Sequence, residues 1–333
     1  MTVMNAVMIT KKGGPEVLAV VEVPVPEPGP GEVRVKVRAT GVGATDLTIL
    51  GGSYPFAPPL PLIPGYETVG IVEKTGEGVT ALVPGDRVAA LLVYGGCAEF
   101  VVRKAEEWVK VPEGVDDAAA AALILNYVTA YQMIHRVSHL APGGSALVNA
   151  ANGGVGQALL DLLRAHGVSA IGAASAARHD IVASYGAVPI EGRRMRLDTG
   201  VHVVRPQGVD AAFDGVGGAA TGECIASTRR GGITVWYGFV GATGTAAVVR
   251  SALRLFVGAP LQLRRGAFYG ITLRYRKDPH PFREDLAALF ALLAQHKITP
   301  RIALRLPLMQ FRSAIETLKN GGITGKIVLT AED

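Results

Sequence analysis

The residues best suited to chemistry form a glycine-rich loop, Ala150-Ala151-Asn152-Gly153-Gly154-Val155-Gly156. The loop follows an apolar run expected to be a strand and leads directly into a segment expected to be a helix. Glycine at 153 and 154 lets the backbone approach a phosphate, and Gly156 lets the helix close onto the strand. Because a helix N-terminus points amides at an anion, the loop predicts a binding site for the pyrophosphate of a dinucleotide. The residues expected to line it are Asn152, Gly153, Gly154, Val155 and Gly156.

The second strand indicates which dinucleotide is bound. A chain that binds NADH usually places Asp or Glu about 20 residues beyond the loop, where the carboxylate holds a ribose hydroxyl. The stretch from 172 to 179 has no acid and offers instead the Ser175 hydroxyl and the Arg178 guanidinium. Both groups can pair with a 2′-phosphate, so we expect NADPH as the cofactor. The alternative is that Arg178 merely caps a solvated helix.

Metal-ligand patterns are weak in this chain. Cys97 and Cys224 form neither a Cys-x-x-Cys pair nor a disulfide framework. His135 and His139 have the spacing of two ligands on one helix face, but no Glu follows the first histidine as in His-Glu-x-x-His. We therefore expect no metal site and interpret the two histidines as a solvated helix end.

The formal net charge of +5 is concentrated in one segment. Between Arg250 and Arg283 there are eight basic residues and one acid, without an interleaved ladder of aromatic residues. Stacking on single-stranded nucleic acid is therefore unsupported, and we expect no nucleic-acid partner. Two interpretations of the segment stay open, a grip on an anionic small molecule or carrier and a solvated surface.

The elements that must position these residues change character along the chain. Residues 1 to about 110 contain β-rich runs separated by Pro and Gly turns. Beyond residue 117, apolar strands alternate with helical segments, which predicts β-α-β units and a parallel sheet. A strand from Phe268 to Leu273, two helices and a last strand from Lys326 to Leu329 follow. The fold class is therefore α/β, with one mostly-β domain and one Rossmann domain with a doubly wound parallel sheet.

Length and composition agree with two globular domains. The chain has 333 residues, of which 49% are hydrophobic and 18% charged, and this balance is not that of a disordered or coiled-coil chain. The longest apolar stretch, Ala118 to Ile134, carries polar residues and is interpreted as a buried helix, not a membrane span. The first ten residues show no secretory signal, so we expect a cytoplasmic protein.

Many of these motifs occur together in one known family. The chain resembles the zinc-independent quinone oxidoreductases (zeta-crystallin-like) of the medium-chain dehydrogenase/reductase superfamily, and within them the vesicle amine transport protein branch. The resemblance implies a GroES-like substrate domain built from residues 1–120 and 267–333, and a Rossmann NADPH-binding domain from 121–266. The matching residues are Gly41-Val42, Asp46, Gly65, Glu67, 84–88, 150–156, 209–210, 213–214, 216–218 and 325–326, with 126–131 and 174–179 for the branch.

The resemblance also implies that the metal of related enzymes is missing here. Zinc-dependent relatives carry a Cys ligand shortly before the family's Asp and a Gly-His-Glu triplet. In this chain those places are Gly43-Ala44-Thr45 before Asp46, and Gly65-Tyr66-Glu67. Without a Lewis acid, the implied chemistry is direct hydride transfer from NADPH to an electrophilic π-system.

Individual site residues follow from the resemblance. It places Asp46 and Tyr54 in the substrate cleft, although Asp46 could instead cap the following turn and Tyr54 could be an anchoring aromatic. It places Asn126 and Thr129 beside the nicotinamide. The catalytic candidates are Asp46, Tyr54 and Asn126. Besides the glycine loop, the expected cofactor-binding residues are Thr129, Ser175, Arg178, Arg193, Gly238 and Lys326.

Two positions depart from the family pattern. The family's Asn ahead of the Asp is Gly43 in this chain, and its Tyr after the third strand is Gly192. The loss of that Tyr leaves Arg193 or Arg194 as the candidate to contact the adenosine phosphate.

Three functions are compatible with these residues. The first is NADPH-dependent reduction of a quinone, and the second is reduction of an α,β-unsaturated carbonyl whose anionic tail the basic segment could hold. The third is a cofactor-binding interaction protein with little turnover. A quinone can take its protons from water, whereas enone reduction gains from a positioned donor, which the sequence does not identify.

The same sequence features bear on assembly. The run from Ala267 to Leu273 predicts an apolar strand at a sheet edge, and an open edge must be covered or paired. Pairing with the same strand of a second subunit would give a homodimer. The alternative is that the C-terminal helices shield the edge within one subunit.

Overall fold

The computed structural model describes residues 2–54, 56–242 and 244–331. The chain forms two compact units. Unit 1 comprises Met1–Val128 and Thr272–Asp333, and unit 2 comprises Thr129–Ile271. The predicted α/β class is confirmed, because unit 1 carries antiparallel β structure and unit 2 carries a parallel sheet.

Unit 1 is organised around a long central strand, β3. Its residues Val33, Val35 and Val37 are buried, while β3 pairs antiparallel with β4, β6 and β15. The sheet order is β14-β15-β3-β4-β5-β7, and β1 and β2 form a separate antiparallel pair. The strands are β1 (Val3–Ile9), β2 (Leu18–Pro24), β3 (Glu32–Val42), β4 (Glu67–Thr75), β5 (Arg87–Leu91), β6 (Phe100–Lys104), β7 (Val109–Lys110), β14 (Ile302–Pro307) and β15 (Lys326–Thr330).

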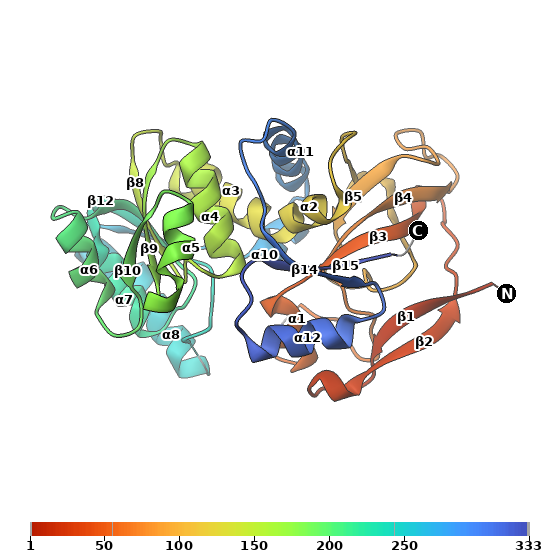
Figure 1. Cartoon of the computed structure of the whole chain (residues 1–333), viewed down its shortest axis with the longest axis horizontal. Helices are drawn as coiled ribbons and strands as arrows, with labels where there is room; N and C mark the ends of the chain where they lie inside the picture. Colours follow the sequence, from red (N-terminus) through yellow and green to blue (C-terminus); the bar gives the residue numbers. More distant parts are fainter. Residues whose placement is uncertain (1, 55, 243, 332–333) are drawn as a thin grey trace. The chain divides into compact units, whose positions relative to one another are not determined.

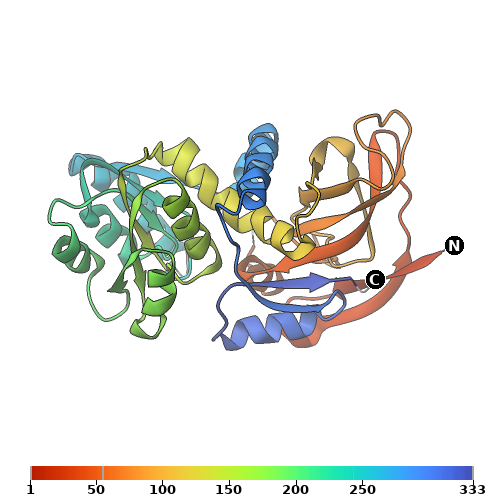
Figure 2. The same cartoon turned by 45° about the horizontal axis from the view of Figure 1, so that its top comes forward.

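Eight helical segments complete the described part of unit 1. They are η1 (Pro15–Val17), α1 (Ala44–Leu50), η2 (Ala105–Glu107), α2 (Asp117–Ala122), η3 (Leu123–Tyr127), α10 (Ile271–Lys277), α11 (His280–Ala294) and α12 (Phe311–Asn320). Figures 1 and 2 show the C-terminal strand β15 lying beside β3. The two ends of the chain therefore build one sheet.

Unit 2 contains six parallel strands in the order β10-β9-β8-β11-β12-β13. The strands are β8 (Ser145–Asn149), β9 (Ser169–Ala174), β10 (Val188–Glu191), β11 (Val209–Asp214), β12 (Thr228–Trp236) and β13 (Arg265–Phe268). The helices are α3 (Val128–Gln132), η4 (Met133–Ser138), α4 (Gly154–Ala165), η5 (Ala176–Arg178), α5 (His179–Ser184), α6 (Leu197–Val204), α7 (Ala219–Ser227), α8 (Thr245–Leu253), η6 (Arg254–Gly258) and α9 (Ala259–Leu261).

The strand order of unit 2 defines a topological switch point. From β8 the chain moves outward through β9 to β10, then returns to β11 on the other side of β8. Right-handed crossovers put α4 and α5 on one face of the sheet, as Figure 1 shows, and α6 and α7 on the other. Ligands of doubly wound sheets bind outside the carboxyl ends of the strands at this point, between β8 and β11.

The predicted strand from Phe268 to Leu273 is wrong. Strand β13 ends at Phe268, and Ile271 already begins helix α10. The chain leaves the sheet after Tyr269, whose amide still donates to the Trp236 carbonyl oxygen at 2.9 Å. Its side chain is buried, and its hydroxyl donates to Gln132 Oε1 at 2.9 Å. The helix then ends in Arg274, Arg276 and Lys277, cations that a helix C-terminus favours. The apolar and β-branched residues of this segment therefore predicted a strand where the structure has the start of a helix.

The predicted buried helix from Ala118 to Ile134 is confirmed as the continuous series α2, η3, α3 and η4, whose apolar residues are largely buried. Within the described part of the chain, no helix is both long enough and apolar enough to cross a membrane.

Candidate active site

The glycine loop lies at the switch point, between β8 and α4. Ala150 adopts a left-handed conformation with φ of 61°, and Gly153 caps the helix. A Cβ on Gly156 would lie 2.3 Å from the Ala150 carbonyl oxygen, so only glycine allows α4 to approach the loop so closely. Gly153 and Gly154 are exposed. The loop therefore has the shape that a pyrophosphate requires, with bare backbone on its outer side.

The side chains of Gln157 and Tyr185 support the glycine loop through hydrogen bonds. Gln157 Nε2 donates to the Asn152 carbonyl oxygen at 2.8 Å, and the Tyr185 hydroxyl donates to Gln157 Oε1 at 3.3 Å. Gln157 is buried in the first turn of α4. This support could not be predicted from the sequence, because Tyr185 lies at the end of α5, 28 residues away from Gln157.

The turn after β9 carries the expected 2′-phosphate residues. Ser175 caps the short helix η5, and the Arg178 amide donates to the Ser175 carbonyl oxygen at 2.8 Å. Both residues are half-buried. Because Ser175 is the N-cap of η5 and Arg178 is its last residue, they lie within one turn of each other after the carboxyl end of β9.

A carboxylate from the neighbouring strand also lies at this turn. Glu191 ends β10 directly beside Ala174. Its carboxylate accepts from the Arg193 amide at 2.9 Å and from the Ala176 amide at 3.3 Å. The hydrogen bond from Arg193, with that from Ala176, holds the pKa of Glu191 below its ordinary value. Glu191 lies outside residues 172–179, and strand pairing, not proximity in sequence, brings it to this turn.

The positions that depart from the family pattern lie next to this turn. Gly192 packs against β9, where a Cβ would stand 3.1 Å from the Ala174 amide nitrogen. Arg193 and Arg194 follow it and are exposed.

On the other side of the switch point, Asp214 ends β11 and is fully buried. Its carboxylate accepts from Asn149 Nδ2 at 3.0 Å and from Thr221 Oγ1 at 2.8 Å, so it fixes the ends of two strands. Gly238 follows β12, and a Cβ there would lie 2.1 Å from the Gly215 carbonyl oxygen. Thr129 is buried in α3. Asp214 is therefore a structural residue at this end of the sheet, and its sequence context predicted no role for it.

In unit 1, Asp46 lies in the first turn of α1 and is almost completely buried. Its Oδ2 accepts from the Gly43 amide at 2.8 Å, so Asp46 does cap this turn. Burial raises the pKa of Asp46 from 3.8 to about 7, although the Gly43 hydrogen bond and the charge of Lys326 oppose the rise.

Lys326 lies in a buried ion pair. Its ammonium contacts the carboxylate of Glu67, and both side chains are at most 5% exposed. The second oxygen of Glu67 accepts from the Leu125 amide at 2.7 Å, next to Asn126, which is half-buried in η3. The charge of Lys326 is therefore already matched within unit 1.

Tyr54 belongs to a cluster of three hydroxyls. Its phenolic oxygen lies 2.6 Å from that of Tyr66 and 2.7 Å from Thr272 Oγ1. Tyr66 and Thr272 are also hydrogen-bonded to each other. Burial, with smaller effects from Tyr54 and the charge of Asp46, raises the pKa of Tyr66 well above its ordinary value. Thr272 could not be predicted as part of this cluster, because it lies 206 residues from Tyr66 in a segment predicted to be a strand.

Among the residues that the structure describes, no three His, Cys, Asp or Glu side chains come together as a metal site. Burial raises the pKa of both Cys97 and Cys224. The rings of His135 and His166 are in contact, with centroids 4.6 Å apart, and His139 ends η4 with a left-handed backbone.

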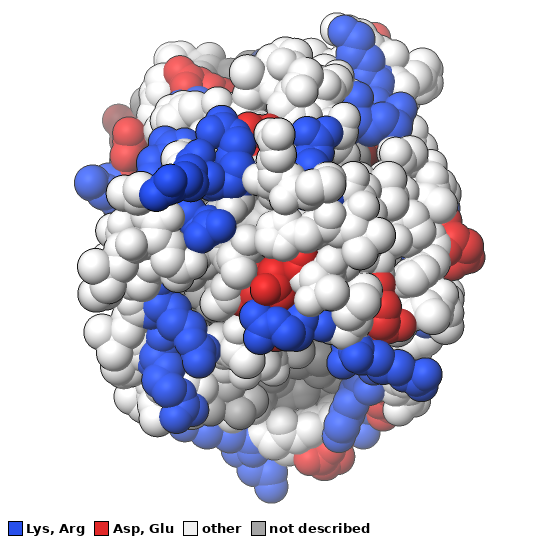
Figure 3. Space-filling model, turned by 90° about the vertical axis from the view of Figure 1, so that its left-hand side faces the viewer, with Lys and Arg blue, Asp and Glu red and all other residues white. Residues whose placement is uncertain are grey.

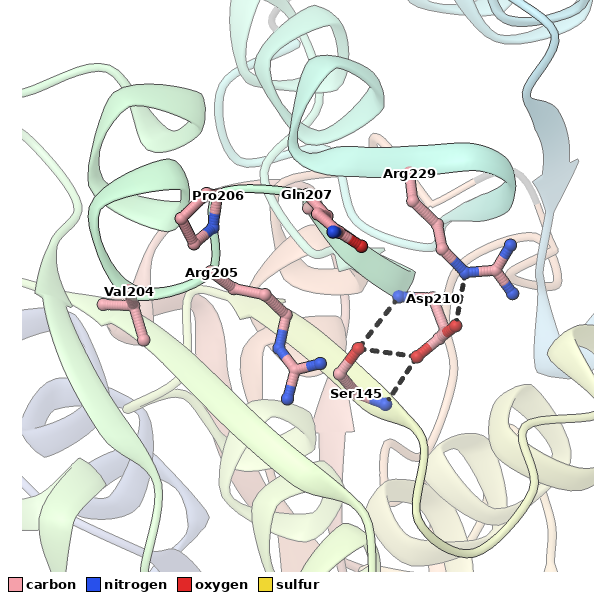
Figure 4. A pocket seen from close by; sticks show the side chains of 8 residues that line it. Ser145, Val204, Arg205, Pro206, Gln207, Asp210 and Arg229 are labelled. Atoms are coloured by element: carbon pink, nitrogen blue, oxygen red, sulfur yellow. Dashed lines mark hydrogen bonds and ion pairs between the residues drawn. The ribbon is translucent and has the colours of Figure 1, made fainter.

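The opposite edge of the parallel sheet holds a separate cavity of about 530 Å³ (Figure 4). Its centre is Asp210, whose carboxylate accepts from the Ser145 hydroxyl and from Arg229 Nε, both at 2.6 Å. These bonds join the amino-terminal ends of β8 and β12 to β11. Since Asp210 is satisfied within the fold, we assign this cluster a structural role.

The net positive charge of the chain resides in unit 2. This unit has thirteen arginines, no lysine and seven acids, a net charge of +6, while the rest of the chain sums to −1. Figure 3 faces this unit and shows basic side chains prevailing over acidic ones. A polyanion such as a dinucleotide is therefore attracted to the unit that carries the glycine loop.

A doubly wound parallel sheet with a glycine loop at its switch point, preceded by a mostly-β unit, defines a medium-chain dehydrogenase/reductase. Residues 29–113 match the alcohol dehydrogenase GroES-like domain, and residues 189–329 match the zinc-binding dehydrogenase family. The human quinone oxidoreductase is 30% identical over 98% of this chain and 97% of its own length. The chain belongs to the quinone oxidoreductase family of this superfamily, as the motifs predicted.

Two further similarities complete the comparison. The synaptic vesicle membrane protein VAT-1 homolog of Danio rerio is 32% identical over 88% of this chain. The match spans 62% of that relative's length. A mycobacterial protein solved in complex with NADPH superposes with a TM-score of 0.86 and 29% identity, covering 98% of this chain and 99% of that one. The GroES-like and Rossmann-like domains of the prediction are thereby confirmed.

Proposed function

We propose that this protein is a zinc-independent, NADPH-dependent oxidoreductase that reduces a quinone. The observation that carries the proposal is the exposed glycine loop at the switch point, followed by a turn that presents Ser175 and Arg178. Gly153 and Gly154 would lie under the pyrophosphate, and Gly156 keeps α4 close enough to direct its amides there. When bound, NADPH supplies a hydride.

The choice of NADPH over NADH depends on Ser175 and Arg178. A guanidinium and a hydroxyl on one turn suit a 2′-phosphate. Glu191 acts against this choice through its charge, but two backbone amides already hold its carboxylate. The mycobacterial neighbour bound to NADPH supports the same cofactor.

Independence from zinc is supported by Tyr66. This residue occupies the place of the ligand histidine, and its hydroxyl is engaged with Tyr54 and Thr272. Elemental analysis of the purified protein tests the proposal, since stoichiometric, tightly held zinc would contradict it.

Reduction of an α,β-unsaturated carbonyl is the second candidate, and the hydroxyl cluster around Tyr54 favours it. Proton donation matters more for an enone than for a quinone. Binding of an anionic tail by the basic segment between Arg250 and Arg283 has less support than the hydroxyl cluster. Arg264 and Arg276 in that segment donate to the backbone carbonyls of Thr228 and Phe56.

The test is a steady-state assay of the purified protein with NADPH and NADH against a panel of quinones and enones. We expect quinone turnover with NADPH at the higher kcat/KM. Turnover of enones alone would favour the second candidate. Tight NADPH binding without turnover of any compound would instead favour the interaction protein.

We also propose that the protein is a homodimer. Among the described strands, β13 pairs only with β12 and so forms an edge of the sheet. The helices just before it expose Val249, Leu253 and Phe256, each at least half exposed, at the spacing of one helix face. An apolar stripe beside an open strand is typical of a surface that a second subunit covers.

A further inference from the structure

The carboxylate of Glu191 connects the turns that follow two neighbouring strands of unit 2. Its Oε2 accepts from the Ala176 amide at 3.3 Å, in the turn after β9, and its Oε1 accepts from the Arg193 amide at 2.9 Å, in the turn after β10. The two strands are joined just before these turns, because the Gly192 amide donates to the Ala174 carbonyl oxygen at 2.9 Å. Glu191 is therefore held at the carboxyl end of β9, where a dinucleotide places its adenosine ribose.

This carboxylate carries a negative charge at neutral pH. The hydrogen bond from the Arg193 amide, with that from the Ala176 amide, lowers the pKa of Glu191 below its ordinary value. Each carboxylate oxygen can accept two hydrogen bonds, so the two bonds from these amides leave room for another donor. Glu191 can therefore accept from a hydroxyl group, whereas a second anion placed beside it would be repelled.

The groups of the turn after β9 favour a different ligand. Arg178 ends η5 and supplies a positive charge that attracts a 2′-phosphate. Ser175 makes no side-chain cap hydrogen bond with η5, so its hydroxyl can donate to a ribose with or without the phosphate. A carboxylate, by contrast, accepts from the 2′-hydroxyl of an unphosphorylated ribose. The two turns together therefore hold one charged group for each form of the cofactor.

We propose that Glu191 is a specificity-determining residue that allows the site to bind NADH as well as NADPH. The proposal deepens the proposed function and rests on the cofactor site that this function requires. The 2′-hydroxyl of NADH would donate to the Glu191 carboxylate. The 2′-phosphate of NADPH would gain from Arg178 but be repelled by Glu191, so the preference for NADPH is smaller than Arg178 alone would give. An acid on β10 thus performs the task that proteins binding NADH usually give to an acid after the second strand.

The experiment compares two probes, adenosine 2′,5′-bisphosphate and adenosine 5′-monophosphate, which differ only in the 2′-phosphate. Isothermal titration calorimetry measures both affinities without requiring turnover. We expect Glu191→Gln to bind the bisphosphate about five- to twentyfold more tightly than the wild type does, because the substitution removes a negative charge. Binding of the monophosphate should weaken by about two- to fivefold, because a neutral amide oxygen is a weaker acceptor than a carboxylate.

Asp180→Asn is the matched control. Asp180 is an exposed acid two residues beyond Arg178, and its substitution removes the same charge while Glu191 keeps its hydrogen bonds. We expect the ratio of the two affinities to change by less than about twofold in this variant, because solvent screens an exposed charge. Thermal unfolding of Glu191→Gln should resemble that of the wild type, since the glutamine side chain keeps the shape and one acceptor oxygen.

The outcomes distinguish this proposal from the function on which it rests. An unchanged ratio of affinities in Glu191→Gln, or an equal change in Asp180→Asn, would overturn the role of Glu191 and leave the reductase function standing. The expected shift in Glu191→Gln, in a protein that binds NADPH and reduces no quinone or enone, would support the role of Glu191 and contradict the reductase function. A wild type that binds neither probe would contradict the cofactor site and the proposal with it.

Discussion

At the scale of single residues, the proposed preference for NADPH over NADH depends on one cation and one anion near the ends of neighbouring strands. Arg178 follows β9, and Glu191 ends β10 beside it. Their charges have opposite effects on a 2′-phosphate. The proposed preference for NADPH therefore requires that Arg178 outweigh Glu191, which a substitution can test.

We expect Arg178→Ala to weaken NADPH binding by about 10- to 100-fold and to leave NADH binding nearly unchanged, since one charge-assisted pair contributes about 1.5 to 3 kcal/mol. Fluorescence titration with both cofactors measures this. Arg205→Ala is the matched control, an exposed arginine at the opposite edge of the same sheet. Equal affinity of the wild type for NADPH and NADH would contradict the prediction.

Asp46 makes stability depend on pH. Its pKa is 3.8 when exposed and about 7 in the fold, so between these values the folded state binds the extra proton. Stability should therefore decrease as pH rises from about 4 to about 7, by up to about 4 kcal/mol, and stay constant above that. Urea unfolding at several pH values measures it.

Asp46→Asn is the control for this titration, because the amide keeps an acceptor for Gly43 but cannot ionise. The unfolding free energy of Asp46→Asn should not show the part of the decrease with pH that the ionisation of Asp46 causes. A decrease of the same size in both proteins would assign the pH dependence to other groups.

At the scale of elements, α4 packs closely against the glycine loop, and this packing predicts different roles for Gly156 and Gly153. Gly156→Ala would put a methyl group against the Ala150 carbonyl and the Ala151 backbone, so we expect unfolding free energy to fall by about 1 to 3 kcal/mol. Gly153→Ala meets only the Ala150 carbonyl oxygen, at 3.3 Å, and should cost less than about 1 kcal/mol.

Cofactor binding should show the complementary pattern. Gly153→Ala adds its methyl group on the exposed side of the loop, so NADPH binding should weaken although the protein stays folded. Thermal unfolding and fluorescence titration of both variants check this. Full NADPH affinity in Gly153→Ala would place the pyrophosphate elsewhere.

Sequence patterns predicted the elements of the cofactor edge well, because each is local. The glycine loop lies, as predicted, between a strand, β8, and a helix, α4. The failure at residues 268–273 arose because a buried side chain, Tyr269, overrode β propensity. Glu191 and Thr272 could not be predicted as site residues, since strand pairing and long-range packing bring them there.

At the scale of the whole molecule, the proposed dimer can be measured directly. Light scattering at micromolar concentration should give twice the 34.7 kDa of one chain. Leu253→Glu with Phe256→Glu should shift the mass toward one chain, because two charges would be buried in the interface. Val203→Glu is the control, an exposed apolar residue on α6, and should leave the mass unchanged. A wild-type mass near 35 kDa would refute the dimer.

The pairing of β15 with β3 has a consequence for biosynthesis. Unit 2 is continuous in sequence and is complete once Ile271 has left the ribosome, whereas β3 must wait for Lys326–Thr330. During that interval residues 39–42 of β3, the ones that pair with β15, stay unpaired on that side. Translation that stops before Lys326 would release a chain whose Rossmann unit can fold but whose β3 edge stays open to other strands. Such products should depend on chaperones or aggregate, even though every residue of the glycine loop is present.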